Sequence, residues 1–294
     1  MKIGVILNRV NFEEKEIIIK LKERGHKVIQ FNNQRLKLNF NALFNNEVND
    51  FSDVDIVLQR SLSLVRGLYS SAVLESAGIK VINDYNSLHI CGDKILTSLK
   101  LFENNIPTPK SGIAFKKNSS LELIEELTGY PSIIKPPIGS WGRLIAKLDN
   151  KNMATAILED RETMGHIFQK VFYIQDYIGP DQRPEDAPTD IRVIFLGGKC
   201  VAAMGRITQS DDFRSNIALG AKGIPLKIDN EMESICKKIA DSVGGEFLGI
   251  DLMQTKKGYT CLEVNGCPQF KGMSKASNLD IAQQFIEYLE ETYA

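Results

Sequence analysis

The sequence has no long hydrophobic run, a single tryptophan and almost no net charge. Lysine and arginine number 36, and aspartate and glutamate number 37, which leaves a formal net charge of −1 over 294 residues. No global positive field is therefore available to gather nucleic acid or an anionic membrane surface. No stretch approaches the roughly 18 apolar residues of a membrane span. We expect a soluble, cytoplasmic protein that binds neither nucleic acid nor a membrane.

Cysteine and histidine are also scarce. The cysteines form no close C-x-x-C pair, and none has a histidine nearby at the spacing of a zinc site. We interpret them as reduced, mostly buried thiols. The histidines match no known motif, so we expect them at structural or surface positions. The residues concerned are Cys91, Cys200, Cys236, Cys261 and Cys267, and His26, His89 and His166.

Strand-like and helix-like segments alternate at the start of the chain. "KIGVIL" predicts a buried strand, "EEKEIIIKLKERG" an amphipathic helix, and "HKVIQF" and "DIVLQR" two further strands. This alternation is typical of a parallel sheet with crossover helices, so we predict an α/β domain over residues 1–87. "NRVN" follows the first strand in place of a glycine-rich phosphate turn, which argues against dinucleotide binding.

The remaining chain combines helices with hairpins. "DKILTSLKLFENN" predicts a helix, "SIIKPP" and "FYIQDYIG" predict strands, and "IRVIFLGGKCVAAMGRI" predicts a hairpin that turns at Gly197 and Gly198. "FLGIDLMQ" and "YTCLEVNG" predict a second hairpin. We place a second domain at residues 88–174 and a third at residues 175–294, so the fold class is α/β (α+β).

Three oxygen-bearing side chains lie in the second of these hairpins. Glu263 and Asn265 are two residues apart and project from one face of their strand, and Asp251 can meet them from the neighbouring strand. Two carboxylates and an amide oxygen suit Mg²⁺, which also bridges to substrate phosphates. Acids near strand ends are more often structural, so this interpretation depends on the other charged positions.

Four cationic side chains accompany these three residues. Lys94 opens a helix, Lys135 ends a strand, and Arg206 and Arg214 flank a polar loop that contains Asn216. Each cation alone would most often be a solvated surface charge. Phosphate is the target that lysine and arginine share, so the whole set indicates a nucleoside triphosphate site. The glycines of "GSWGR", directly after "SIIKPP", allow the backbone to approach a phosphate closely.

A series of short motifs resembles the motifs of the ATP-grasp ligases, in the same order. They are "CGDK", "SIIKP", "GSWGR", "QDYI", "TDIRV", "DFRSN", "GIDL" and "LEVNG". Within the RimK-like branch the chain resembles the LysX and ArgX family of amino-group-carrier ligases, chiefly through "CGDK", "GSWGRLIAK" and "PQFKG". The likeness covers nearly the whole chain. It implies an ATP-grasp fold preceded by a Rossmann-like pre-ATP-grasp domain.

The resemblance implies a role for each motif. ATP would lie between two antiparallel sheets, with "GSWGR" as a mobile flap and "QDYI" as the strand that reads adenine; family members often have Glu where Asp176 stands. The implied ATP contacts are Lys94, Lys135, Gly139, Ser140, Trp141, Gly142, Arg143, Gln175, Asp176, Tyr177, Ile178, Arg192, Arg206 and Asn216, of which Arg206 and Asn216 are also catalytic. The implied ligands of two Mg²⁺ ions are Asp251, Glu263 and Asn265.

The resemblance also implies a reaction. ATP-grasp ligases activate a carboxylate as an acylphosphate, which an amine attacks to give an amide, ADP and phosphate. In LysX and ArgX the carboxylate is the side chain of the C-terminal glutamate of LysW, a small acidic carrier protein. The amine is the α-amino group of α-aminoadipate or glutamate. Family members form homo-oligomers, so we expect a dimer or tetramer.

A dipeptide accompanies the choice of amino acid in this family: Asn followed by Thr or Ser in α-aminoadipate ligases, and Gly-Phe in glutamate ligases. Gly272-Met273 is nearer the glutamate type, which predicts a glutamate–LysW ligase of arginine biosynthesis. The flexible Met leaves α-aminoadipate and lysine biosynthesis, or both substrates, open. The candidate substrate residues are Arg66, Arg192, Arg214, Lys271, Gly272 and Met273.

Two other functions fit parts of the same pattern. A ligase that adds glutamate to another protein or to a small molecule would share the ATP site, but "GSWGRLIAK" and "PQFKGM" argue against it. A nucleotide-binding regulator without turnover would lack a metal ligand or the flap. The candidate metal ligands and the residues of the flap are all present here, which favours an enzyme.

Overall fold

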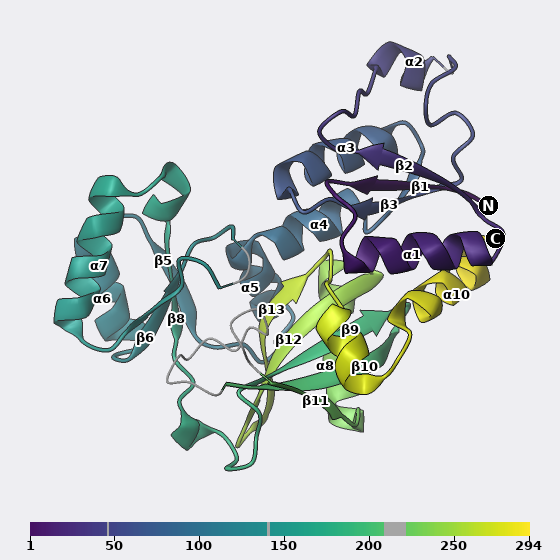
Figure 1. Ribbon diagram of the computed structural model, residues 1–294. Coiled ribbons are helices and arrows are strands. Elements are labelled where there is room, and N and C mark those ends of the chain that lie inside the picture. Colours follow the sequence, from purple (N-terminus) through teal and green to yellow (C-terminus); the bar gives the residue numbers. More distant parts are fainter. Residues whose placement is uncertain (46, 140–141, 209–221) are drawn as a thin grey trace.

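The strands of the protein form three sheets in the computed structural model, which describes residues 1–45, 47–139, 142–208 and 222–294 (Figure 1). Helices and strands are both abundant, as the sequence predicts. No helix in the described ranges is both long enough and apolar enough to cross a membrane.

The N-terminal sheet is parallel and has the strand order β2-β1-β3-β4. Strand β1 is buried on both faces, as expected of a parallel sheet: Ile3 and Val5 lie in one hydrophobic cluster, and Ile6 lies in another. The elements are β1 (Lys2–Leu7), α1 (Phe12–Glu23), β2 (Lys27–Asn32), α2 (Phe40–Phe44), β3 (Ile56–Arg60), α3 (Leu64–Ser76) and β4 (Lys80–Ile82).

The second sheet, called here the lid sheet, is antiparallel and has the order β5-β8-β6-β7. Helices α6 and α7 cover one face, where Ile124 and Leu158 pack on Ile134 and Ile174. The elements are β5 (Ser111–Ala114), α6 (Lys117–Leu127), β6 (Ser132–Lys135), β7 (Ala146–Leu148), α7 (Lys151–Met164), the 3₁₀ helix η1 (Ile167–Lys170), β8 (Phe172–Asp176) and the 3₁₀ helix η2 (Pro180–Gln182).

The third sheet, called here the C-terminal sheet, is antiparallel with the order β11-β10-β9-β12-β13. Both predicted hairpins are present. The first turns at Gly197 and Gly198, whose φ angles of 54° and 94° favour glycine. The strands are β9 (Asp190–Leu196), β10 (Lys199–Ile207), β11 (Lys222–Leu226), β12 (Phe247–Thr255) and β13 (Gly258–Asn265).

Both faces of the C-terminal sheet are covered, as the alternation along β9 shows. Val193 and Phe195 face the cluster that contains α8, whereas Ile194 and Leu196 face the cluster that contains α1, α9 and α10. Helices α4 and α5 lead from the N-terminal domain to the lid sheet (Figure 1). The helices are α4 (Tyr85–Gly92), α5 (Lys94–Glu103), α8 (Asn230–Val243), α9 (Lys271–Ser277) and α10 (Ile281–Tyr293).

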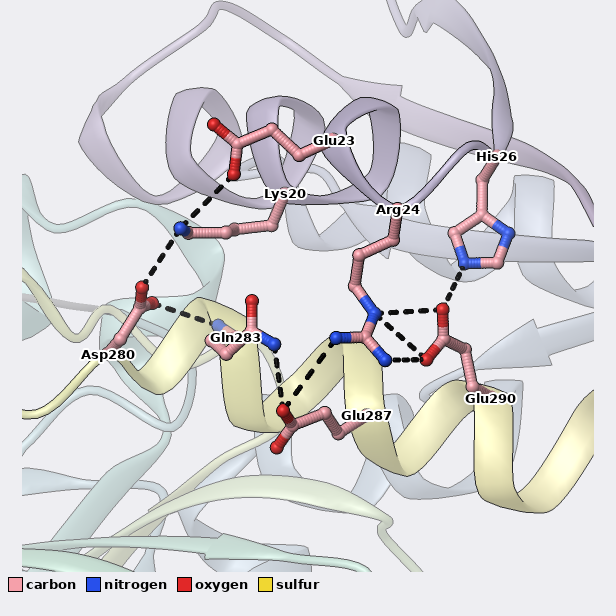
Figure 2. Close-up of polar contacts among 8 residues, drawn as sticks. All are labelled: Lys20, Glu23, Arg24, His26, Asp280, Gln283, Glu287 and Glu290. Atoms are coloured by element: carbon pink, nitrogen blue, oxygen red, sulfur yellow. Dashed lines mark hydrogen bonds and ion pairs between the residues drawn. The ribbon is translucent and has the colours of Figure 1, made fainter.

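The last helix, α10, lies beside α1 and so joins the two ends of the chain (Figure 2). Arg24 donates to both carboxylate oxygens of Glu290, with Nε 2.9 Å from each oxygen, and Nε2 of His26 lies 2.8 Å from Oε1 of the same carboxylate. The bond from Arg24 lowers the pKa of Glu290 to about 2. His26 therefore has a structural contact, as expected.

Candidate active site

A cavity of about 630 Å³ lies where the lid sheet, the C-terminal sheet and the N-terminal domain meet. Its volume is within the range of small-molecule sites, about 300–1,000 Å³. Lys135 on β6 and Gln175 on β8 line one side, and Arg192 on β9 and Asp251 on β12 line the other. Ser61, after β3, lines the side formed by the N-terminal domain.

A buried cluster of carboxylates and guanidinium groups forms one wall of the cavity. Asp251 lies opposite Glu263 on β13 and opposite Arg192 on β9 in the strand register. Nη2 of Arg192 lies 2.8 Å from Oδ2 of Asp251, and Nη2 of Arg206 lies 3.0 Å from Oδ1. Arg206 also donates to both oxygens of Asp190, at 2.5 and 2.7 Å. Two acids and two arginines thus neutralise one another across β9, β10 and β12.

The electrostatics of this cluster keep Asp251 and Arg206 ionised. Burial alone would raise the pKa of Asp251, but the charges of Arg192 and Arg206 outweigh it and lower that pKa. Burial disfavours the charged form of Arg206 as well, yet Asp251 and Asp190 raise its pKa. The cluster therefore presents fixed charges to a ligand in the cavity.

The donor set at the end of the β12–β13 hairpin fits Mg²⁺. Asp251 and Glu263 are cross-strand neighbours, and Asn265 follows two residues later and pairs with Gly249. In the described part of the chain, no three acidic, histidine or cysteine side chains come together as a metal site, so the third protein ligand would be the Asn265 amide. Carboxylate and amide oxygens are hard ligands of the kind that Mg²⁺ prefers.

A chain of hydrogen bonds fixes Lys135 in the wall formed by the lid sheet. Nζ of Lys135 donates to Oε1 of Gln175 at 2.6 Å, and Nε2 of Gln175 donates to the Tyr173 hydroxyl at 2.9 Å. That hydroxyl also contacts Ser98 at 2.7 Å and Ser111 at 3.0 Å. Burial lowers the pKa of Lys135 to about 8. The ammonium group is thus held in place next to the cavity.

The turn between β6 and β7 approaches Lys94, the first residue of α5. Nζ of Lys94 donates to the carbonyl oxygen of Gly139 at 2.7 Å and lies 3.9 Å from Oε1 of Glu263. Gly139 and Gly142 line the cavity, and Gly142 has a φ of 67°. Lys94 therefore connects the glycine-rich turn with the carboxylate wall.

Comparisons with known proteins agree with this geometry. The RimK-like ATP-grasp domain matches residues 91–289, and the LysX pre-ATP-grasp domain matches residues 3–90. The α-aminoadipate–LysW ligase LysX of Saccharolobus solfataricus is 37% identical over 281 residues, 95% of this chain and 98% of that protein. The glutamate–LysW ligase ArgX of Sulfolobus acidocaldarius is 36% identical over 294 residues, 100% and 99% of the two chains. The chain belongs to the LysX/ArgX family.

A solved structure supports the fold independently. The RimK-domain ATP-grasp protein of Sphaerobacter thermophilus has a TM-score of 0.77 at 19% identity, over 98% of this chain and 99% of that one. The predicted ATP-grasp fold with its pre-ATP-grasp domain is thus confirmed. As a member of the LysX/ArgX family, the protein is an ATP-dependent ligase.

Most of the residues predicted for ATP and metal line this single cavity. Arg143 is the exception among the described residues, because it is exposed and does not line the cavity. Ser140, Trp141, Arg214 and Asn216 lie outside the described residues. Those in the cavity wall are Lys94, Lys135, Gly139, Gly142, Gln175, Asp176, Tyr177, Ile178, Arg192, Arg206, Asp251, Glu263 and Asn265.

Most of the predicted substrate residues that the structure describes lie outside the cavity wall. Met273 is only 1% exposed and packs in the core, because α9 turns its side chain toward the C-terminal sheet. Lys271 is exposed, with its ammonium 5.9 Å from the centre of the Phe12 ring, and Gly272 is half-buried; neither lines the cavity. Arg66 is exposed on α3 and also lies outside the cavity wall. Of this set, Arg192 alone among the described residues lines the cavity.

The sequence interpretation missed Asp190 and Tyr173. Asp190 lies two residues before Arg192, and Tyr173 lies two residues before Gln175. Each therefore shares a strand face with a predicted site residue, so the alternation of side chains could have identified both.

Proposed function

We propose that this ligase joins the α-amino group of glutamate to the side-chain carboxylate of the C-terminal glutamate of a LysW-type carrier protein. ATP is converted to ADP and phosphate. The carrier and the amino acid come from the names of the relatives, LysX and ArgX. The observation that supports the proposal best is the convergence of Lys94, Lys135 and Arg206 with Asp251 and Glu263 in one cavity.

In this proposal the cations of the cavity bind the phosphates. Lys135, fixed by Gln175, and Lys94 would neutralise phosphate charge, and Arg206 would stabilise the charge on the γ-phosphoryl group during transfer. Asp251, Glu263 and Asn265 would hold Mg²⁺, for which we propose two ions. Bound magnesium supplies positive charge that draws electrons from the phosphate oxygens.

The proposed reaction has two steps. A carboxylate oxygen of the carrier attacks the γ-phosphorus of ATP, and the bond to the ADP oxygen breaks. The amino group of glutamate then attacks the acyl carbon, so a C–N bond forms, the C–O bond to phosphate breaks and the ammonium proton is lost. Arg192, which lines the cavity beside Asp251, would bind a carboxylate of the incoming amino acid.

α-Aminoadipate is a second candidate substrate. The LysX and ArgX relatives are 37% and 36% identical to the chain, so overall similarity does not favour either amino acid. Gly272 favours glutamate by position, whereas Met273 is buried and does not line the cavity. We propose that glutamate is the amino-acid substrate and that the enzyme acts in arginine biosynthesis. We further propose that it works in the cytoplasm as a homo-oligomer, either a dimer or a tetramer.

The test is a ligation assay with purified components. The protein is incubated with ATP, Mg²⁺ and a LysW-type carrier, with glutamate in one tube, α-aminoadipate in a second and both in a third. The intact mass of the carrier identifies the added amino acid, and released phosphate is counted in parallel. A carrier without its C-terminal glutamate is the control. A mass gain with glutamate is expected, and phosphate release without a mass gain would contradict the proposal.

A further inference from the structure

Three buried polar side chains of the N-terminal domain bind the backbone of residues 266–271, which form one loop and the first residue of α9. This loop connects β13, which ends at Asn265, to α9. Three of its members, Gly266, Cys267 and Gln269, line the cavity. The hydrogen bonds from these three side chains all go to main-chain groups of this segment, so they do not depend on its side chains.

Asn83, which follows β4, holds the start of the loop. Its side-chain amide donates to the carbonyl oxygen of Gly266 at 2.7 Å and to that of Phe247 at 2.6 Å. Its side-chain oxygen accepts from the backbone N–H groups of Glu246 and Phe247, at 2.9 and 3.0 Å. Asn83 thus ties the first loop residue to the beginning of β12.

Arg60, the last residue of β3, holds the middle of the loop. It donates to the carbonyl oxygen of Pro268 at 2.9 Å and to Oε1 of Glu14 at 3.2 Å. Arg60 and Glu14 are 3% and 2% exposed. A buried ion pair is seldom more stabilising than apolar side chains of the same volume, because both charges lose their hydration. An apolar residue, however, could not donate to Pro268, so this pair is better explained by positioning than by stability.

Glu13, on α1, holds the end of the loop. Its Oε1 accepts from the backbone N–H groups of Phe270 and Lys271, at 3.0 and 2.9 Å. Glu13 is 4% exposed, so these two bonds replace hydration that the carboxylate loses on burial. One oxygen therefore fixes the point at which the loop enters α9.

We infer that Glu13, Arg60 and Asn83 are positioning residues for the two substrates other than ATP, the amino acid and the carrier. They hold residues 266–271 against the side of the cavity formed by the N-terminal domain, where Ser61 also lies. The proposed phosphate contacts come from the lid sheet, the C-terminal sheet and α5, on the other sides. The inference rests on the proposed function and predicts an effect on amino-acid or carrier binding, with ATP binding unchanged.

The test compares Glu13→Ala and Glu13→Gln with Arg24→Ala. Arg24 is the matched control because it directly follows the same helix and also contacts the C-terminal part of the chain, but at Glu290 on α10 (Figure 2). Three quantities are measured: amide hydrogen exchange of residues 270 and 271, the Kd of a non-hydrolysable ATP analogue, and kcat and KM for the amino acid and carrier.

For Glu13→Ala we expect exchange of the two amides and the KM of the amino acid or carrier to rise at least about tenfold, the scale of a lost hydrogen bond to a charged group. The Kd of the ATP analogue should stay within about twofold, a small change on that scale. Glu13→Gln keeps a carbonyl acceptor, so it should recover part of both losses and serves if the alanine variant does not fold. Arg24→Ala should change none of the three quantities.

Two results would overturn the inference. One is faster exchange in either Glu13 variant with no change in KM for either substrate. The other is unchanged exchange at residues 270 and 271. If the unmodified protein ligates neither amino acid, the proposed function fails, but the exchange measurement still decides whether Glu13 holds the loop.

Discussion

Arg192 and Asp251 lie opposite each other on β9 and β12 and form a two-point ion pair, with Nε to Oδ1 at 2.5 Å and Nη2 to Oδ2 at 2.8 Å. Asp251 is also the proposed metal ligand. Its oxygens are thus bound by guanidinium groups where a metal ion would bind, so the two kinds of partner compete. When Asp251 binds the metal ion, the phosphate oxygens of ATP would neutralise the positive charges of Arg192 and Arg206 in its place. ATP and Mg²⁺ should therefore bind more tightly together than separately.

Asp251→Asn tests this relationship. The variant removes one metal-binding charge and leaves Arg192 and Arg206 facing a neutral amide. We expect kcat for ligation to fall by about 10²-fold or more, the usual effect of losing one electrostatic contact in an active site. The matched control is Asp53→Asn, an exposed aspartate that pairs with Lys2 at the surface. A kcat within about threefold of the unmodified protein, a change of under 1 kcal/mol in the barrier, would exclude the proposed metal role.

The pH dependence of ATP binding should reflect Lys135. Its pKa of about 8 means that the charge on free Lys135 is present below that pH and is lost above it. A bound phosphate favours the charged form, so the Kd of an ATP analogue should rise as the pH increases above about 8. Lys135→Met should bind more weakly and lose this dependence, whereas the exposed Lys100→Met should keep it. Equal slopes above pH 8 in all three proteins would contradict the assignment.

Lys135 should make the unliganded protein more stable as the pH rises, although it makes ATP binding weaker. A folded-state pKa of about 8 lies below the ordinary value of 10.5, so the unfolded chain binds more protons between these two pH values. The free energy of unfolding contributed by this group therefore rises with pH across that window. Chemical denaturation at several pH values should show a smaller rise for Lys135→Met than for the unmodified protein.

Tyr173→Phe tests the hydrogen-bond chain that holds Lys135. The variant removes the hydroxyl that contacts Ser98, Ser111 and Gln175 in a buried site. Buried partners left unsatisfied cost about 1–3 kcal/mol, so the free energy of unfolding should fall by that amount. Tyr69→Phe is the control, since Tyr69 is 73% exposed. Equal denaturation midpoints for the two variants would show that the chain contributes nothing.

The packing of α10 against the rest of the protein should depend mainly on apolar contacts. Phe285 on α10 is 1% exposed and stacks on Phe247 with a centroid distance of 4.3 Å. Phe285→Ala should cost about 3–5 kcal/mol of unfolding free energy. Arg24→Ala removes an exposed pair, so its effect should be much smaller and should disappear in high salt. An effect of Arg24→Ala as large as that of Phe285→Ala would overturn this ranking.

Local patterns were sufficient to predict the elements that create the metal-binding hairpin. The alternation in "GIDLM" and "LEVNG" predicted that Asp251 and Glu263 meet, and the register places them opposite each other. The same local patterns could not predict that β9 lies beside β12, because strand order depends on packing across the whole sheet. The pairing of Arg192 with Asp251 was therefore not foreseen.

The interface between the N-terminal domain and the rest of the chain was the least predictable part. Glu13 lies 257 residues from Phe270, and Glu13 and Glu14 stand in the sequence at the start of a predicted amphipathic helix, where charged residues are usually exposed. Only the fold brings them to buried positions. Met273 is the opposite case: the family dipeptide made it a candidate substrate residue, whereas α9 directs its side chain into the core.

The central claim is that the cavity activates a carboxylate by transferring the γ-phosphoryl group of ATP to it. The most direct measurement uses a carrier whose C-terminal glutamate carries ¹⁸O in its side-chain carboxylate, with unlabelled ATP, Mg²⁺ and glutamate. The account predicts that one ¹⁸O atom appears in the released phosphate for each amide formed. Amide formation with phosphate free of ¹⁸O would contradict an acylphosphate and with it the proposed use of this site.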